Sequence, residues 1–136
     1  THTCPSCSEL CRNSDVILGI INAFRNSTKY EADTTLDIPE YNVKFTVDYS
    51  GRGGEFAAWV SGHTHVDRVA VVEGTLCTSI MSDWNHQSAS LTFERTTGTV
   101  LEHAFDVYTI DPNNHKLYVV RVGAGEDREF DYTPKA

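Results

Sequence analysis

Two histidines one residue apart, His63 and His65, are the residues of this chain whose types and spacing best suit chemistry. They lie in the segment Ser61-Gly62-His63-Thr64-His65, directly after the apolar run 56–60. An extended backbone sends residues i and i+2 to the same side, so both imidazoles can point into one cavity. Imidazole is a common metal ligand, and a close pair of metals can hold the oxygens of a phosphate ester. The pattern indicates a metal site; the alternative is a loop that carries two solvated histidines.

This segment resembles the last signature of the calcineurin-like metallophosphoesterases, Gly-His-x-His at the carboxyl end of a sheet strand. The opening Thr1-His2-Thr3-Cys4-Pro5 resembles the preceding family motif, an isolated histidine often found as Ser-His-x-Pro, with the proline one place late. By this resemblance His2 and His63 bind one metal and His65 binds the other. Segments of the tail between 98 and 128 resemble a bacterial and prophage subgroup of the family.

The resemblance covers only the second half of a family domain, here the single domain 1–136. The family's first three motifs, Asp-x-His, Gly-Asp and Gly-Asn-His-Asp/Glu, are absent from the chain, so we expect no catalytic residue in it. Asn85-His86 is similar to the third motif but follows His63 and has Trp84 in place of glycine, so we interpret it as an ordinary loop. The implied parent protein is a hydrolase that uses two divalent ions, manganese, iron or zinc, on a phosphate-ester substrate.

Asp67 continues the every-second-residue series of the two histidines. A carboxylate at this place can accept the second N–H of a ligand imidazole and fix its tautomer. The alternative is a salt bridge with Arg68 or Arg52, and the sequence does not choose between the two.

Arg121 and Arg128 have the planar donors that bind a phosphate through two hydrogen bonds. The acids Glu126, Asp127 and Glu129 lie beside them in the sequence. We therefore favour a structural network of ion pairs over a phosphate site.

Two further interpretations stay open beside the phosphoesterase. One is a non-enzymatic, β-rich binding or structural module, for example one encoded by a prophage. The other is a metal cluster at Cys4, Cys7 and Cys11, which lie next to His2. That spacing is compatible with zinc or iron–sulfur ligation, with a disulfide, or with free thiols, and we favour free thiols.

Composition indicates one soluble globular domain, because 40% of the 136 residues are hydrophobic and 22% are charged. The net charge of −8 disfavours a general nucleic-acid surface or an anionic-membrane surface. No apolar run approaches the roughly 20 residues of a membrane span, so we expect a cytoplasmic protein. The chain begins at Thr1 and its only methionine is Met81, so we expect the native amino terminus to lie outside it.

The elements that position these residues follow from periodicity. Ser14 as N-cap and Asp15 in the first turn predict one mostly buried helix over about 15–26, and 31–41 reads as a loop. Alternation predicts a strand near 43–47, and the turn at 51–54 would join it as a hairpin to the apolar run 56–60. Further strands are expected near 68–72, 75–81, 88–95, 103–110 and 117–122. The class is therefore α+β, mostly β, with a long β meander; the family resemblance implies part of a four-layer αββα sandwich.

Assembly follows from the missing half. Strands near Thr1 and 56–60 would then present unpaired edges. We expect the chain to cover them as a dimer or in a complex with the missing amino-terminal half.

Overall fold

The computed structural model describes residues 12–62, 65–81 and 93–133. Within them the chain forms one α-helix, two short 3-10 helices and eight strands. The helices are α1 (Ser14–Asn26), η1 (Pro39–Tyr41) and η2 (Val100–Glu102). The strands are β1 (Lys29–Asp33), β2 (Lys44–Asp48), β3 (Trp59–Ser61), β4 (Arg68–Val72), β5 (Thr75–Ser79), β6 (Ala104–Asp111), β7 (Lys116–Gly123) and β8 (Arg128–Asp131). The predicted α+β, mostly β class is confirmed.

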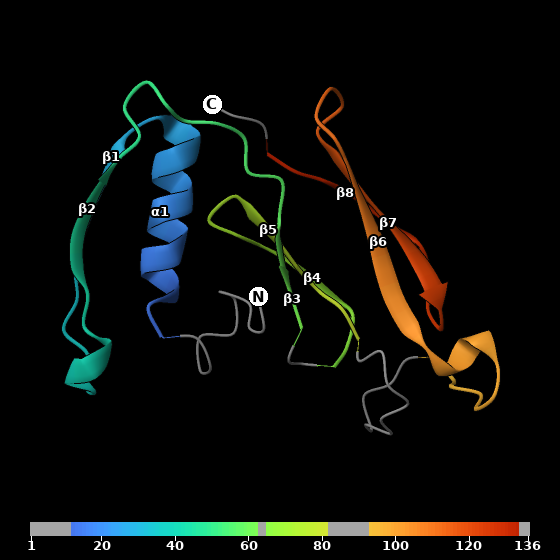
Figure 1. Cartoon of the computed structure of the whole chain (residues 1–136). Helices are drawn as coiled ribbons and strands as arrows, with labels where there is room; N and C mark the ends of the chain where they lie inside the picture. Colours follow the sequence, from blue (N-terminus) through green and yellow to red (C-terminus); the bar gives the residue numbers. More distant parts are fainter. Residues whose placement is uncertain (1–11, 63–64, 82–92, 134–136) are drawn as a thin grey trace.

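The strands form three sheets, ordered β1-β2, β3-β5-β4 and β6-β7-β8. Across Figure 1 the layers are the β1-β2 hairpin, then α1, then β3-β5-β4, then β6-β7-β8. The helix is therefore enclosed between two sheets, and the central sheet between the helix and the third sheet. Among the described residues, no helix is long and apolar enough to cross a membrane.

Helix α1 is mostly buried, as predicted, because it has a sheet on each side. Its buried apolar residues are Val16, Leu18, Ile21 and Ala23. The predicted N-cap is wrong: the helix already begins at Ser14, and Asn13 precedes it in the left-handed conformation at φ 59 without a side-chain cap hydrogen bond. Asparagine tolerates that conformation better than most residues. At the other end the left-handed Ser27 donates its N–H to the carbonyl oxygens of Ala23 and Phe24, which terminates the helix.

The predicted loop over 31–41 is wrong at its start, which belongs to β1. This strand pairs antiparallel with β2, Ala32 opposite Phe45. Its five residues Lys-Tyr-Glu-Ala-Asp alternate, but only Ala32 is buried, so the segment is too short and too polar to stand out as a strand. The Tyr30 ring lies across α1 at Gly19, where a Cβ would come within 2.3 Å of it, so only glycine leaves room for this contact.

The predicted hairpin between β2 and the strand that ends near Val60 is also wrong. Strand β2 pairs with β1, whereas β3 pairs with β5 in parallel, Trp59 opposite Cys77. The segment between β2 and β3 crosses from one layer to the other past the end of α1 (Figure 1). Adjacent strands with a glycine-rich turn between them therefore lie in different sheets.

Strands β4 and β5 form a tight hairpin, with Val72 opposite Thr75. Its two turn residues, Glu73 and Gly74, have φ values of 48° and 73°, as a type I′ turn requires. Strand β4 has the predicted bounds, and β5 ends at Ser79, two residues earlier than predicted. Every residue of β5 is buried, because this strand is the middle of the central sheet.

The predicted long meander after Asp67 is wrong as a single sheet, because β4 and β5 belong to the central sheet. Its last two strands, β6 and β7, lie in the third sheet and are joined by the turn after Asp111. Strand β8 completes it beside β7 and was not predicted. The predicted strand over 88–95 lies mostly outside the described residues, and 93–95 are not strand. The two larger sheets meet in a core of Leu76, Leu117, Val119 and Tyr132.

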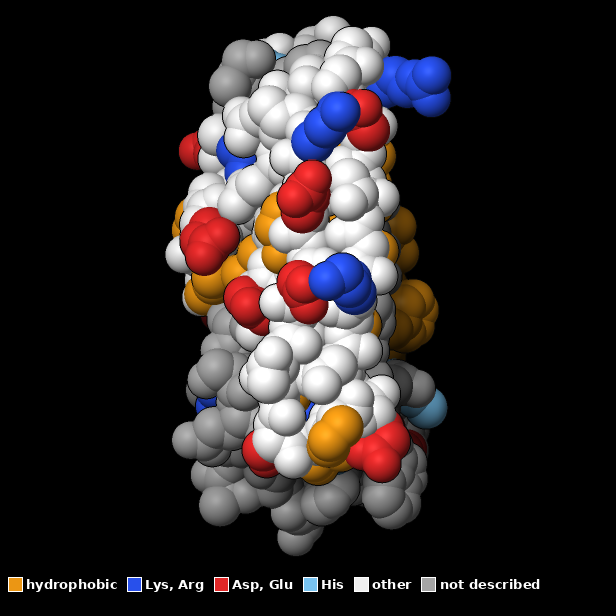
Figure 2. Space-filling model, turned by 90° about the vertical axis from the view of Figure 1, so that its left-hand side faces the viewer, with side chains coloured by type: hydrophobic (Ala, Val, Ile, Leu, Met, Phe, Trp, Pro, Cys, Tyr) orange, Lys and Arg blue, Asp and Glu red, His pale blue; other side chains and the backbone are white. Residues whose placement is uncertain are grey.

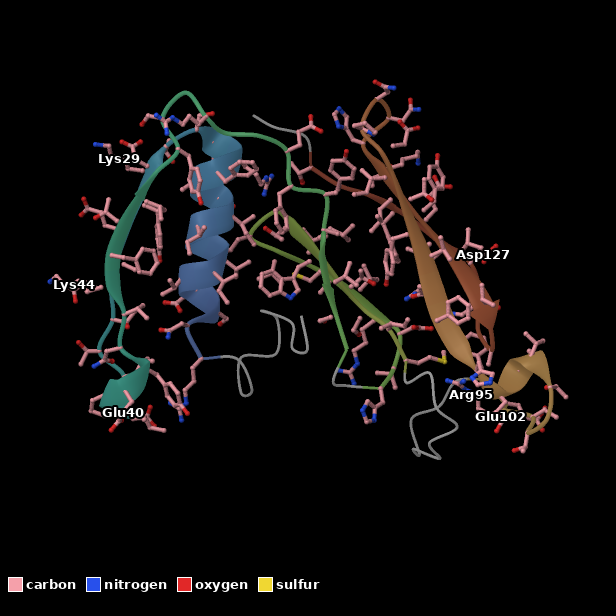
Figure 3. The ribbon with its side chains drawn as sticks, viewed as in Figure 1. Lys29, Glu40, Lys44, Arg95, Glu102 and Asp127 are labelled. Atoms are coloured by element: carbon pink, nitrogen blue, oxygen red, sulfur yellow. The ribbon has the colours of Figure 1, made fainter. Side chains whose placement is uncertain are left out.

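The outer face of the β1-β2 hairpin is charged with both signs. Lys29 pairs with Asp48 at 3.4 Å and Lys44 with Asp33 at 2.5 Å. Figure 2 shows acidic and basic side chains side by side on this face, and Figure 3 shows Lys29 and Lys44 directed away from α1. Exposed pairs of this kind contribute little to stability, so we interpret this face as a solvated surface.

Candidate functional site

The segment that carries His63 and His65 leaves the central sheet at the carboxyl end of β3. Strand β5 runs parallel to β3, and the two end level, with Ser61 opposite Ser79. The N–H of Ile80 donates to the carbonyl of Ser61 at 3.1 Å, which extends the pairing by one residue. The segments after both strands therefore start from the same sheet edge, where parallel sheets commonly bind ligands.

Two buried serines fix the ends of this loop. Ser61 Oγ donates to the carbonyl of Thr78 at 3.3 Å, and Ser79 Oγ donates to the carbonyl of Val66 at 2.9 Å. Val66 is itself buried, with 8% of its surface exposed. The loop is thus tied to β5 both where it leaves the sheet and where it returns.

His65 is exposed and has a left-handed backbone, with φ 56. The extended backbone that would send both histidines to one side ends at Ser61, so that premise does not extend to His65. The other two expected ligands, His2 and His63, lie outside the described residues, as do Cys4, Cys7, Cys11 and His86. The convergence of the three histidines stays a prediction.

Asp67 lies in the loop after β3, and its carboxylate binds two arginines of the third sheet. Its Oδ1 accepts from Arg121 Nη2 at 2.8 Å and from the N–H of Met81 at 3.0 Å. Arg128 Nη1 lies 3.3 Å from the same oxygen and also donates to the carbonyl of Ser79 at 3.3 Å. One carboxylate therefore links the histidine loop, the residues that follow β5, and strands β7 and β8.

The second acid of this ion cluster is Asp106 on β6, whose side chain is fully buried. It accepts from Arg121 Nε at 2.6 Å through Oδ1 and from Arg128 Nη2 through Oδ2. Arg121 also donates to the carbonyl of Ala124 at 2.7 Å. Only 1% of the Arg121 side chain is exposed. The buried charges of Arg121 and Asp106 are therefore compensated by their ion pairs and not by water.

The cluster shifts two neighbouring pKa values. Tyr108 donates its hydroxyl to Asp106 at 3.2 Å. Burial, with the negative charge of Asp106 as the second cause, raises the pKa of Tyr108 to about 12. For Arg121, burial alone lowers the pKa, but hydrogen bonds and charge attraction from Asp106 and Asp67 outweigh it, so the net pKa is raised.

These contacts decide several sequence interpretations. Arg121 and Arg128 do form a structural network, as favoured, but their charge partners are Asp106 and Asp67. Of the acids next to them in the sequence, Asp127 accepts the backbone N–H of Arg121 at 2.8 Å. The proposed salt bridges of Asp67 with Arg68 or Arg52 are wrong, because Asp67 binds the two arginines of the third sheet.

Asp106 is the member of this ion cluster that the sequence interpretation missed. Alternation in β6 places Phe105 and Val107 on one face and Asp106 on the other, and the register sets Asp106 opposite Arg121. An acid and an arginine at facing positions of a buried sheet surface are the signal that could have identified the pair.

The described histidines and cysteine outside the loop do not add to a metal site. His103 is exposed, His115 packs edge-on against Tyr132 with ring centroids 5.7 Å apart, and Cys77 is buried in β5. Among the residues that the structure describes, no three His, Cys, Asp or Glu side chains lie close enough together to hold a metal ion. A metal site in this chain would therefore include residues outside the described ones, and His2 and His63 stay the expected ligands beside His65.

In comparisons with models of protein families, with curated proteins and with solved structures, the chain matches none of them. The family resemblance therefore rests on the histidine motifs and on the tail segments of the sequence.

Proposed function

We propose that this chain supplies the histidine half of a two-metal phosphoesterase site, which needs the residues of a first half for hydrolysis. The observation that supports this proposal is the position of the histidine loop. The loop follows β3 at the sheet edge where the parallel strands β3 and β5 both end. That edge is where a sheet exposes loop residues to a ligand while the strands hold them in place.

In this proposal His2, His63 and His65 bind divalent ions such as manganese, iron or zinc. Bound metals of this kind activate water and neutralise charge on a phosphate ester. The rest of the chain orients the ligands: Ser79 and Asp67 anchor the return of the loop beyond His65. The left-handed backbone of His65 adds support, because strained non-glycine residues gather at ligand sites.

Calorimetric zinc titration of the chain tests the ligand set. We expect the wild type to bind zinc, and His2→Ala, His63→Ala and His65→Ala each to weaken binding at least about tenfold, since each removes one ligand. His103→Ala removes an exposed imidazole elsewhere and is the matched control. Equal affinity in all five proteins would show that the three histidines do not converge.

Hydrolysis is tested separately. We expect the chain alone to cleave a model phosphodiester no faster than metal in buffer, because the family's bridging aspartate is absent from its sequence. Robust turnover by the purified chain that His63→Ala abolishes would contradict the proposal that the site needs a first half.

The second candidate function, a β-rich binding module, is favoured by one specific observation. The outward side of the third sheet carries the exposed apolar residues Phe105, Val107 and Val120. A contiguous apolar patch on a sheet face commonly marks a contact with another protein. Retained zinc affinity in all histidine variants would favour this second function over the first.

A further inference from the structure

The β6-β7-β8 sheet has one face in the core and one that carries an exposed apolar patch. Val107 lies opposite Val120 and Phe105 opposite Val122, so these four residues share the outward face. Phe105, Val107 and Val120 keep 47%, 49% and 48% of their surface exposed. Leu117, which points to the other face, is buried. We call these four outward residues the apolar patch.

A row of acids borders the apolar patch along β8. Asp127, Glu129 and Asp131 alternate along the strand and are all exposed, and the register places Glu129 opposite Tyr118 on the outward face. Figure 3 shows Asp127 on the side of the sheet that faces away from the central sheet. Lys116 pairs with Glu129 and Asp131 at one end of the row. The carboxylate of Asp127, at the other end of the row, therefore keeps more negative charge than the two carboxylates that Lys116 contacts.

A shallow depression of about 330 Å³ joins the acidic row to the apolar patch. It is lined by Tyr118, Val119, Val120, Asp127, Arg128 and Glu129. Its apolar lining suits the aliphatic stem of a lysine or arginine, and the carboxylate of Asp127 suits the charged head, beside the Glu129 carboxylate that Lys116 already contacts. The Tyr118 ring adds a surface over which a cation is favoured.

We propose that this face binds an amphipathic helix of a partner protein, with an apolar stripe for the patch and lysine or arginine along one flank for the acidic row. The inference stands whether or not the chain binds metal. Nucleic acid and anionic membranes are disfavoured, because both would meet the carboxylates with like charge. A second copy of this chain is also disfavoured, because it would bring a second acidic row to the same interface.

The dimensions of sheet and helix agree with this occupant. Side chains on one face of a strand repeat every ~6.8 Å, and the turns of an α-helix repeat every ~5.4 Å. Two or three helical turns therefore cover the apolar patch. Neighbouring strands lie about 4.8 Å apart, whereas a helix with its side chains is about 10 Å wide. A helix over β6 and β7 therefore carries one flank above β8 and its acids.

The probe is a synthetic 14-residue helical peptide with leucine at i, i+3, i+4 and i+7 and lysine along one flank, measured by fluorescence anisotropy with the full 136-residue chain. A peptide with glutamate in place of lysine tests charge, and a scrambled peptide tests the stripe. Val107→Thr with Val120→Thr removes apolar surface at half-exposed strand positions. Asp127→Asn with Glu129→Gln removes two charges and keeps acceptor oxygens.

The chain offers a matched control for each pair of substitutions. Val69→Thr with Val71→Thr changes two valines of β4 that are 53% and 66% exposed. Asp33→Asn with Asp48→Asn removes the same charge from the β1-β2 hairpin. We expect the lysine peptide to bind, both patch variants to weaken it at least about tenfold, and both control variants to change it less than about twofold.

Three results would overturn the inference. Equal loss in patch and control variants would indicate general attraction to an acidic protein, and equal binding of the glutamate peptide would exclude charge recognition. The third is a dimer in light scattering that Val107→Thr with Val120→Thr dissociates, since a second copy would then occupy the face.

Discussion

Arg121 binds two aspartates that reach it from different parts of the fold. Asp106 comes from the neighbouring strand β6, and Asp67 comes from the loop between β3 and β4. The side chains of Arg121 and Asp106 are almost fully buried, so neither charge has water to replace a lost partner. Such a pair adds little net stability over an apolar pair, but removal of one partner is costly.

We therefore expect Arg121→Met to lower the free energy of unfolding by about 3–5 kcal/mol, because Asp106 keeps a buried charge with less compensation. Urea unfolding followed by circular dichroism gives the value. Arg52→Met, at an exposed position, is the matched control for loss of an arginine. A loss below about 1 kcal/mol at Arg121 would show that water reaches the ion cluster.

Tyr108 makes stability depend on pH in the alkaline range. Its pKa is raised from 10.0 to about 12 by burial and by Asp106, so the folded state holds the phenolic proton more tightly than the unfolded state. The stability that the neutral phenol contributes is complete below pH 10 and is lost as pH rises through about 12.

We expect Tyr108→Phe to make the fall of the free energy of unfolding between pH 10 and about 12 less steep. Tyr41→Phe, which removes a half-exposed phenol, is the control, and equal slopes in both variants would contradict the assignment.

At the residue scale the sequence identified the types that matter but not their partners. Asp67 and Arg121 were both selected from the sequence, each with neighbours in the chain as expected partners. The structure joins them over 54 positions, a separation that no local pattern reports. The convergence of His2 and His63 stays a prediction, because both lie outside the described residues.

Among the elements, the β4-β5 turn offers a direct test of backbone strain. Glu73 has φ 48, a left-handed conformation that costs most residues about 1–2 kcal/mol. Asparagine tolerates this conformation, and Asn-Gly is the favoured pair for a type I′ turn. We expect Glu73→Asn to raise the free energy of unfolding by about 0.5–1 kcal/mol.

The measurement is again urea unfolding, with Glu73→Val as the opposite variant, because a β-branched residue is strained at positive φ. Glu73 also accepts an exposed hydrogen bond from Asn22 at 3.2 Å, whose loss subtracts from the gain. A stability that falls in both variants would mean that this contact outweighs the strain.

Strands rich in apolar residues were predicted, whereas short strands made mostly of polar residues were missed. Strand β4 has an apolar run with the expected bounds, whereas β1 has one buried residue and β8 reads as Arg-Glu-Phe-Asp, mostly charged. The pairing partner of each strand was harder to predict from the sequence than the strand itself. The glycine-rich turn after β2 suggested a hairpin, but the following segment crosses to another sheet, which depends on layers and not on local sequence.

For the whole molecule, the shared core predicts that the two larger sheets unfold together. Leu117 is 2% exposed and packs with Leu76 across the interface between them. We expect Leu117→Ala to lower the free energy of unfolding by about 2–5 kcal/mol. Amide exchange should then accelerate in β5 as well as in β7.

The control is Val120→Ala on the outward face of the same strand, where a half-exposed side chain contributes less than about 1.5 kcal/mol. Exchange that accelerates in β6, β7 and β8 alone would show that the third sheet opens independently of the central sheet.

The order β3-β5-β4 also has a consequence for the time at which the histidine loop takes its place during synthesis. Strand β3 leaves the ribosome before β4 and β5, but its partner is β5, with Trp59 opposite Cys77. The β4-β5 hairpin is local and can form within about 1–10 μs. Until it has formed, β3 has no strand of its own sheet to join, so the loop that begins at Gly62 is anchored only after the last strand of that sheet has emerged.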